Sequence, residues 1–225
     1  MLKAFQNLLQ TQFFFLRNTP LLLAVSGGLD SMALTDLCLK SGLNIALAHC
    51  NFKLRGAESD GDEKFIMDFA KENNLEVFVT HFDTETHAQT NKQSIQMAAR
   101  QLRYDWFETL KNEYGFEYIL TAHHADDNLE TLLINLSRGT GLDGLTGIPE
   151  VNGATARPML GFSRNDIHNY ALQEQIQWRE DSSNKSIKYL RNNIRHTIIP
   201  VLKSLNPSFI ENFQTTQSHL KDTQL

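Results

Sequence analysis

The chain has 225 residues, of which 41% are hydrophobic, so it is long enough for one sizeable folded domain with an appendage and is not a disordered chain. Its formal net charge of −5 argues against a general nucleic-acid binder, although basic residues gather between Arg179 and Lys203. Because no segment reaches the about 20 apolar residues of a membrane span and no secretory cleavage pattern occurs, we expect a cytoplasmic protein without membrane contact.

Apolar runs and helical patterns alternate along the first 140 residues. An amphipathic helix is predicted over residues 2–16, and short apolar runs that indicate buried strands follow at 21–25, 45–49, 77–82 and 118–121. Helical spacing is found at 32–40, 60–73, 94–114 and 126–137. This alternation predicts an α/β fold, a parallel sheet with right-handed crossovers and helices on both faces.

The second part of the chain has a different pattern. Residues 139–153 are rich in glycine and predict loops, and helices are predicted near 163–174, 187–204 and 207–222. We therefore expect a sheet domain at 1–150 and a mostly helical extension at 151–225.

The first predicted strand runs directly into Ser26-Gly27-Gly28-Leu29-Asp30-Ser31, which we call the glycine loop. A glycine-rich turn that opens a helix points backbone N–H groups and a helix dipole at one small volume, which suits a phosphate. The two serines add hydroxyl donors, and Asp30 can hold the Mg²⁺ that accompanies nucleotide phosphates. The loop is not a Walker A motif, because no Gly-Lys-Ser/Thr closes it. The alternative is a serine-rich turn that binds nothing.

Other polar groups are predicted close to the same edge of the sheet, where ligands of such folds bind. After the second strand, Arg55 is a candidate phosphate partner, and His49 is either functional or hydrogen-bonded within the fold. Arg100 and Arg103 share a helix face and either clamp a triphosphate or form a solvated surface.

The fourth predicted strand is followed by His123, His124, Asp126, Asp127 and Glu130. Two histidines and three acids beside a phosphate loop favour metal binding and proton transfer. The blander alternative, for Asp126 or Asp127 singly, is a helix N-cap. A zinc site is disfavoured, because a third ligand at fixed spacing is missing.

Together these blocks resemble the tRNA(Ile)-lysidine synthetase family of N-type ATP pyrophosphatases, over residues 20–205. The resemblance also rests on three later blocks, which are Arg138-Gly139-Thr140-Gly141, Arg157-Pro158 with Leu160, and Asp181-x-Ser183-Asn184 leading to Arg191-Asn192-x-Ile194-Arg195. One departure is Phe52, where the family often has a second histidine, and any role of that histidine is not carried over. Another is length, because many members continue into a C-terminal domain that we expect to be absent here.

The resemblance implies an adenine nucleotide alpha hydrolase-like fold and a two-step reaction. ATP adenylates the oxygen on C2 of the wobble cytidine of a CAU-anticodon tRNA(Ile). The amine of free L-lysine then attacks C2 and expels AMP, which changes codon reading from AUG to AUA. It implies ATP and Mg²⁺ as cofactors and leaves a homodimer open. The implied nucleotide-binding residues are Ser26, Gly27, Gly28, Leu29, Asp30, Ser31, His49, Arg55 and His123, with Asp30 also holding the metal.

Catalytic roles are implied for Asp30 toward Mg²⁺, for Arg100 toward phosphate or the reacting cytosine, and for Asp127 and Glu130 toward lysine or the base. Lys188, Arg191 and Arg195 are the candidates for binding tRNA. The alternative for that basic helix is docking against the acidic sheet domain.

Three rival functions stay open at this point. A tRNA thiolase would start from the same adenylate but would rely on cysteines, and the chain has only Cys38 and Cys50, without metal or redox spacing. Amide-forming relatives such as the GMP and NAD synthetases lack the block between Asn184 and Arg195. A nucleotide- or tRNA-binding module without turnover is the third.

Overall fold

The computed structural model describes residues 1–180 and 190–223, and its framework is a six-stranded sheet. The strands are β1 (Leu21–Ala24), β2 (Ile45–Asn51), β3 (Val77–His81), β4 (Tyr118–Leu120), β5 (Val151–Asn152) and β6 (Thr155–Ala156), in the order β3-β2-β1-β4-β6-β5. All neighbours pair in parallel except β5 and β6, which form an antiparallel hairpin at one edge. The mostly parallel sheet that the alternation predicts is therefore confirmed.

The strand order reverses direction at β1, which lies between β2 and β4. Leu23 of β1 stands opposite Leu47 of β2 and Leu120 of β4, so the carboxyl ends of these three strands meet at one edge. Such a switch point is where open parallel sheets bind ligands. The glycine loop leaves β1 at this point.

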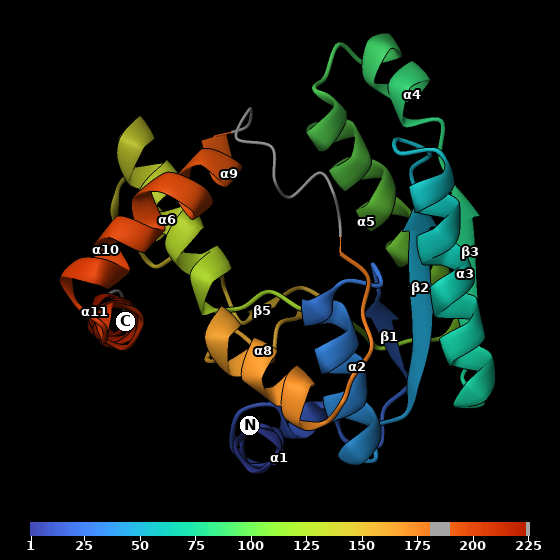
Figure 1. Cartoon of the computed structure of the whole chain (residues 1–225), viewed down its shortest axis with the longest axis horizontal. Helices are drawn as coiled ribbons and strands as arrows, with labels where there is room; N and C mark the ends of the chain where they lie inside the picture. The colour runs from blue at the N-terminus through green and yellow to red at the C-terminus, as the bar shows by residue number, and fades with distance from the viewer. Residues whose placement is uncertain (181–189, 224–225) are drawn as a thin grey trace.

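Helices cover both faces of the sheet (Figure 1). One face packs against the first helical segments α1 (Leu2–Thr11) and η1 (Phe14–Leu16), and against α2 (Leu29–Lys40), α3 (Ala57–Glu72) and α8 (Arg164–Gln173), in a core of fully buried leucine, phenylalanine and isoleucine side chains. The other face packs against α5 (Ile95–Tyr114), whose Phe107 and Leu110 contact Leu22 and Ile119. Burial of these apolar side chains is the main force that holds the layers together.

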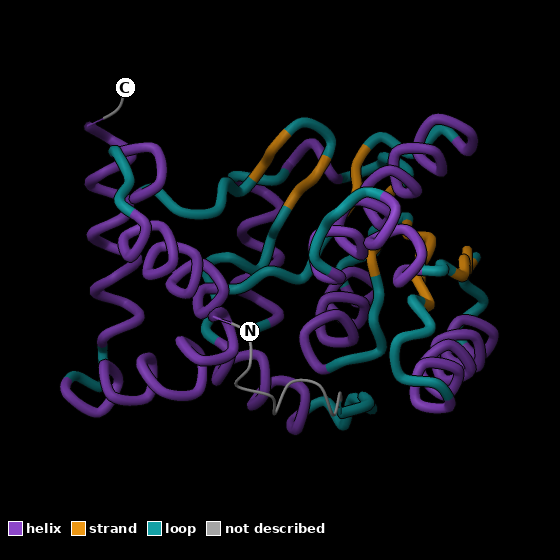
Figure 2. The backbone as a smooth tube through the Cα atoms, turned by 90° about the horizontal axis from the view of Figure 1, so that it is seen from above, coloured by secondary structure: helices purple, strands orange, loops and turns teal. Residues whose placement is uncertain are grey.

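A separate cluster of helices lies at one end of the molecule (Figures 1 and 2). It consists of α6 (Ala125–Arg138), α7 (Leu142–Leu145), α9 (Leu190–Asn193), a π-helix at Ile194–Ile198, α10 (Ile199–Leu205) and α11 (Phe209–Thr223). Its core contains Leu129, Ile194, Ile199, Ile210 and Phe213, so α6 joins the sheet region to the C-terminal helices.

The structure corrects the sequence prediction in three places. The helix predicted at 2–16 ends at Thr11, and the aromatic run after it forms a separate 3-10 turn. A short helix, α4 (Thr84–Thr90), was not predicted, although Asp83 caps it by accepting from the backbone of Thr86. Residues 139–153, predicted as loops, contain α7 and β5, and β6 follows them.

No helix among residues 1–180 and 190–223 is long and apolar enough to cross a membrane.

Candidate active site

The glycine loop closes on itself through its two serine hydroxyls. Ser26 donates its backbone N–H to Ser31 Oγ at 3.2 Å, and Ser31 Oγ donates to the Gly28 carbonyl at 3.0 Å. Gly27 has a φ of +84°, a conformation that glycine adopts without the steric cost of a Cβ. Because α2 already begins at Leu29, the free N–H groups of its first turn face this loop. The local chemistry is that of an anion cradle.

Asp30 lies in that first turn, and its two carboxylate oxygens differ. Oδ2 accepts from Arg164 Nη1 at 3.2 Å, whereas Oδ1 is buried and has no hydrogen-bond partner in the described part of the chain. Mg²⁺ bound to a nucleotide takes one or two carboxylates and completes its shell with phosphate and water. The residues present therefore fit a nucleotide-bound Mg²⁺ at Asp30. No group of three or more His, Cys, Asp and Glu side chains within residues 1–180 and 190–223 could hold a metal alone.

His124 connects the glycine loop to α6. It is 1% exposed, and its Nε2 lies 3.7 Å from Asp30 Oδ2 and 3.4 Å from Asp127 Oδ2. Burial opposes a charge on this ring, but the neighbouring carboxylates, with Asp127 first, raise the pKa of His124 above its ordinary value. The ring also caps α6, because His124 Nδ1 accepts from the Asp127 backbone N–H at 3.4 Å, while the Asp127 side chain accepts from the His124 backbone N–H at 3.1 Å.

His123, the adjacent residue, has the opposite electrostatic character. Burial is the main cause that lowers the pKa of His123 to about 4, and Arg157 and Arg100 add to it against the pull of Asp127. The ring is therefore neutral at pH 7, with Nδ1 2.9 Å from Thr121 Oγ1. Two consecutive histidines thus supply one neutral and one charge-prone ring beside the glycine loop.

Asp127 and Glu130 share one guanidinium group. Arg195 donates from Nε to Glu130 Oε1 at 2.5 Å, and from Nη2 to Glu130 Oε2 at 3.0 Å and to Asp127 Oδ1 at 2.9 Å. Glu130 is 0% exposed, and burial raises its pKa despite the Arg195 contact. The charges of His124, His123 and Arg195 hold the pKa of Asp127 below its usual range, against the effect of burial. The two carboxylates together bind one cationic group, the guanidinium of Arg195.

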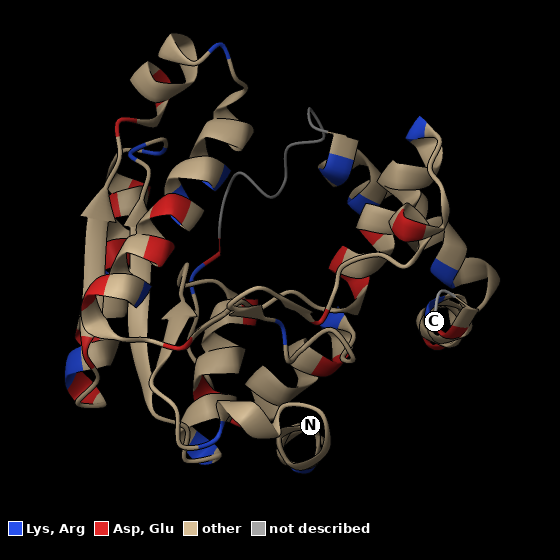
Figure 3. Ribbon diagram, turned by 180° about the vertical axis from the view of Figure 1, so that it is seen from behind, with Lys and Arg blue, Asp and Glu red and all other residues tan. Residues whose placement is uncertain are grey.

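Basic and acidic positions lie close together where α9 and the π-helix pack against α6 (Figure 3). Arg191 donates from Nη2 to Thr131 Oγ1 at 2.9 Å, and its Nε lies 3.7 Å from Glu130. Arg195 lies in the π-helix, a local widening that often marks functional sites. Both arginines thus dock against acidic residues of α6 in this structure, which is the alternative to tRNA binding. Their contact with tRNA remains a prediction. Lys188, the third candidate, lies outside the described residues.

Two further predicted residues make contacts within the fold. His49 Nδ1 lies 2.9 Å from the Val25 carbonyl, and the ring is 4% exposed, so the fold-internal alternative accounts for one ring nitrogen. Arg55 donates to Asp62 Oδ2 at 2.9 Å. The other oxygen of Asp62 accepts from Arg179 Nε at 2.5 Å. His49 therefore lies beside the residue that precedes the glycine loop, whereas Arg55 pairs with α3.

The sequence indicated a basic stretch between Arg179 and Lys203 but not which acidic side chains its members pair with, and it gave no role to Arg164. Arg164 binds Asp30, which lies 134 residues earlier in the chain. Arg179 binds Asp62 across 117 residues, and Lys203 binds Asp126 across 77 residues. Sequence separation of that size gives no local signal. His124 was noticed as one of two histidines but received no role, although its position as N-cap of α6 follows from the pattern.

The fold and this site define a nucleotide-binding α/β domain of the PP-loop class. The family model described as "PP-loop domain" matches residues 1–202, and the chain belongs to that family. Among curated proteins, the chain is similar to the tRNA(Ile)-lysidine synthases of Porphyromonas gingivalis (44% identity over 205 residues), Bacteroides thetaiotaomicron (42% over 214) and Chlorobaculum tepidum (44% over 205). The resemblance predicted from the sequence motifs is confirmed.

These relatives are longer than the matched region. The alignments cover 91%, 95% and 89% of this chain but 45%, 50% and 62% of the three relatives, so the chain spans about half of their length. Two solved structures share the fold at low identity. They are a U34-tRNA thiolase from Methanococcus maripaludis (TM-score 0.75, 15% identity, covering 97% of this chain and 79% of that one) and an NH3-dependent NAD synthetase from Campylobacter jejuni (TM-score 0.54, 14% identity, covering 98% and 91%).

Proposed function

We propose that this chain carries the catalytic site of a tRNA(Ile)-lysidine synthase. The reaction would transfer AMP from ATP to the oxygen on C2 of the wobble cytidine in a CAU-anticodon tRNA(Ile), with release of pyrophosphate. The amine of free L-lysine would then attack C2, lose a proton and expel AMP together with that oxygen. ATP is split to AMP and pyrophosphate, and the tRNA changes from reading AUG to reading AUA. The similarity to lysidine synthases over about nine-tenths of the chain supports this proposal.

The observation that carries the proposal is the placement of two different sites around one histidine. On one side of His124 is Asp30 in the glycine loop, and on the other is the Asp127–Glu130 pair on α6. A ligase of this kind must hold a nucleotide phosphate and an amine donor close together. The described geometry brings an anion cradle and a cation site within reach of a single ring.

On the nucleotide side, the glycine loop would bind the phosphates, and Mg²⁺ at Asp30 would neutralise the charge on them. Arg164 holds the second oxygen of Asp30 and thereby orients the carboxylate. Arg100 on α5 is exposed, which leaves its guanidinium able to reach a phosphate or the reacting base.

On the amine side, Asp127 and Glu130 would hold the cationic lysine. Arg195 occupies their oxygens in this structure, so lysine must take positions that Arg195 now holds. The attacking amine must lose a proton, and a carboxylate with a raised pKa is the better base for that step. Glu130 is therefore our choice for accepting the proton, because its burial raises its pKa.

Arg195 and Arg191 would bind tRNA after leaving the acidic pair, which would link tRNA binding to lysine entry. We also propose a cytoplasmic location, a homodimer and a division of the chain near residue 150. A thiolase is disfavoured, because Cys38 is buried in α2 and burial raises the pKa of Cys50 to about 12, so neither thiol is a ready nucleophile.

The test is transfer of radiolabelled lysine to a CAU-anticodon tRNA(Ile) transcript with Mg-ATP. We expect incorporation by the wild-type chain and none by Asp30→Ala, with Lys221→Ala as an active control at an exposed position. Incorporation of sulfur instead of lysine, or lysine transfer that does not need ATP, would contradict the proposal.

A further inference from the structure

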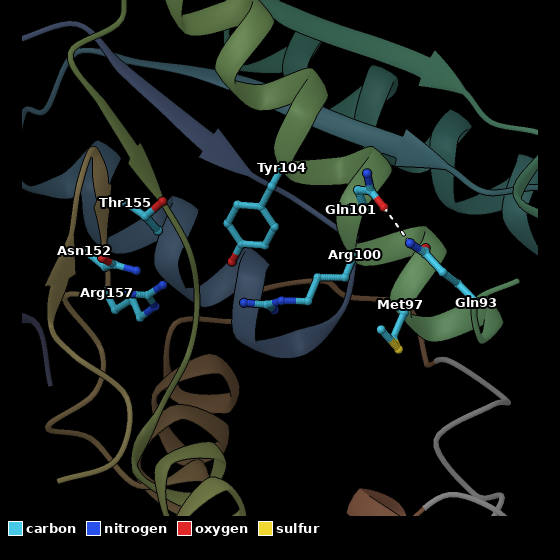
Figure 4. Close-up of a pocket in the computed structure, with 8 residues that line it drawn as sticks. All are labelled: Gln93, Met97, Arg100, Gln101, Tyr104, Asn152, Thr155 and Arg157. Atoms are coloured by element: carbon cyan, nitrogen blue, oxygen red, sulfur yellow. Dashed lines mark hydrogen bonds between the residues drawn. The ribbon is translucent and has the colours of Figure 1, made fainter. Parts of the chain in front are cut away.

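A pocket of about 430 Å³ lies between α5 and the β5–β6 hairpin, and the proposed reaction uses only Arg100 of its lining. The lining residues are Gln93, Met97, Arg100, Gln101, Tyr104, Asn152, Thr155 and Arg157 (Figure 4). None of the eight is acidic, and two are arginines that come from opposite walls. The volume falls in the range of small-molecule sites.

Arg157 belongs to the same edge of the sheet as the glycine loop. It follows β6 directly, and β6 runs parallel to β4 with Ala156 opposite Leu120. Thr121 donates its backbone N–H to the Ala156 carbonyl at 3.1 Å, which places Arg157 level with the residues that lead to His123. The pocket is thus a continuation of the switch-point edge where ligands of this fold bind.

The guanidinium of Arg157 is buried and only partly satisfied. The residue is 5% exposed, and Nη1 donates to the Pro149 carbonyl at 2.8 Å. Its Nε is buried and has no hydrogen-bond partner in the described part of the chain. Buried donors without partners are rare in folded proteins, because desolvation without a compensating bond is costly. Arg157 is therefore held in place by its Nη1 bond, and its Nε–H is left to donate to a ligand.

The opposite wall offers a flat platform. Arg100 Cζ lies 4.7 Å from the centre of the Tyr104 ring. Figure 4 shows Arg100 and Arg157 pointing toward one another across the pocket, with the Tyr104 ring beside them. Two like charges that face each other are unfavourable until an anion lies between them. Aromatic rings and guanidinium planes are also the surfaces on which unstacked bases of RNA stack.

We propose that this pocket receives one unstacked nucleotide of the RNA substrate, with its base on Tyr104 and its phosphate between Arg100 and Arg157. The side-chain amides of Gln101 and Asn152 also line the pocket and would hydrogen-bond to the edge of the base. The inference rests on the proposed function, which supplies the RNA and makes cytidine the nucleotide of choice. Arg157 becomes a binding residue, although the Arg157-Pro158 block had no role in the sequence analysis.

The experiment is a ligand-observed NMR titration of the full chain with cytidine 5′-monophosphate, cytidine and ribose 5-phosphate. Tyr104→Leu should weaken cytidine and cytidine 5′-monophosphate on the order of 10-fold and leave ribose 5-phosphate unchanged. Arg157→Lys should weaken the two phosphate-containing ligands and leave cytidine unchanged. Tyr114→Leu, at a 51%-exposed tyrosine near the other end of α5, and Arg17→Lys, before β1, are the matched controls.

The titration is repeated with a non-hydrolysable ATP analogue and Mg²⁺, and cytidine 5′-monophosphate should stay bound. Three results would overturn the proposal: no saturable binding to the wild-type chain, equal binding by all variants, or displacement by the ATP analogue, which would make the pocket part of the ATP site. The half-buried Tyr104 keeps the test valid if Arg157→Lys fails to fold. Nucleotide binding without lysine transfer would count against the proposed function and leave the pocket standing.

Discussion

Removal of Arg195 should destabilise the protein through the charge that it leaves behind. Arg195 makes three hydrogen bonds to Glu130 and Asp127, at 2.5, 3.0 and 2.9 Å, and Glu130 is 0% exposed. Loss of one partner from a buried ion pair costs about 3–5 kcal/mol, because the remaining charge is uncompensated. Arg191 Nε lies 3.7 Å from Glu130 and retains part of the attraction, so we expect about 3 kcal/mol for Arg195→Ala at pH 8.

The cost should depend on pH in a defined direction. Burial already raises the pKa of Glu130, and removal of Arg195 raises it further, so protonation relieves the uncompensated charge as the pH falls. Arg195→Ala should therefore cost less at pH 5 than at pH 8, and the double variant with Glu130→Gln should cost less than Arg195→Ala alone at pH 8.

The assay is urea unfolding followed by circular dichroism, with Lys221→Ala as the control. Lys221 and Glu150 form a 3.9 Å pair whose side chains are 41% and 45% exposed, and such pairs contribute roughly 0–1 kcal/mol. The reasoning would be refuted if Arg195→Ala cost no more than this control, or if Glu130→Gln gave no relief.

Three further outcomes follow from the site. Because the pKa of His123 falls to about 4 on folding from an ordinary value near 6.5, unfolding free energy should rise by about 3 kcal/mol between pH 4 and 6.5; His123→Asn should flatten that rise in urea titrations. Gly27→Ala should cost about 1–2 kcal/mol at its φ of +84° and abolish Mg-ATP binding measured by calorimetry, whereas the exposed Gly153→Ala, also at positive φ (+56°), should lose stability without losing ATP. Asp30→Asn should weaken Mg-ATP much more than metal-free ATP in the same instrument, and equal weakening of both would argue against metal binding there.

The sheet was predictable because its signal is local. The indicated strands β1, β2 and β4 are largely buried apolar runs, whereas the edge strand β3 is only partly buried. The alternation of strands with helices favours parallel pairing. The hairpin β5–β6 was missed because each strand has only two residues, too few to show a period. The glycine loop was found because phosphate binding needs glycine and helix-opening residues that are adjacent in the chain.

The pairing of the site could not be predicted in the same way. Asp127 and Glu130 were identified from one turn of α6, but their partner Arg195 comes from a π-helix about 65 residues later. Sequence gives the spacing of Arg191 and Arg195 on a face and leaves open whether that face meets solvent, RNA or protein. Only the packing of α9 and the π-helix on α6 decides it, and that depends on long-range apolar contacts such as those of Ile194.

Most ion pairs of the site join an early acidic residue to a late basic one. Asp30, Asp62, Asp126 and Glu130 are all translated before residue 150, and Arg164, Arg179, Lys203 and Arg195, which pair with them, come after it. Arg55, a second partner of Asp62, precedes it. A nascent chain that emerges from the ribosome therefore exposes several carboxylates before the later basic residues that pair with them are synthesised. A fragment cut near residue 150 would therefore keep these four carboxylates and lose most of the cations that pair with them.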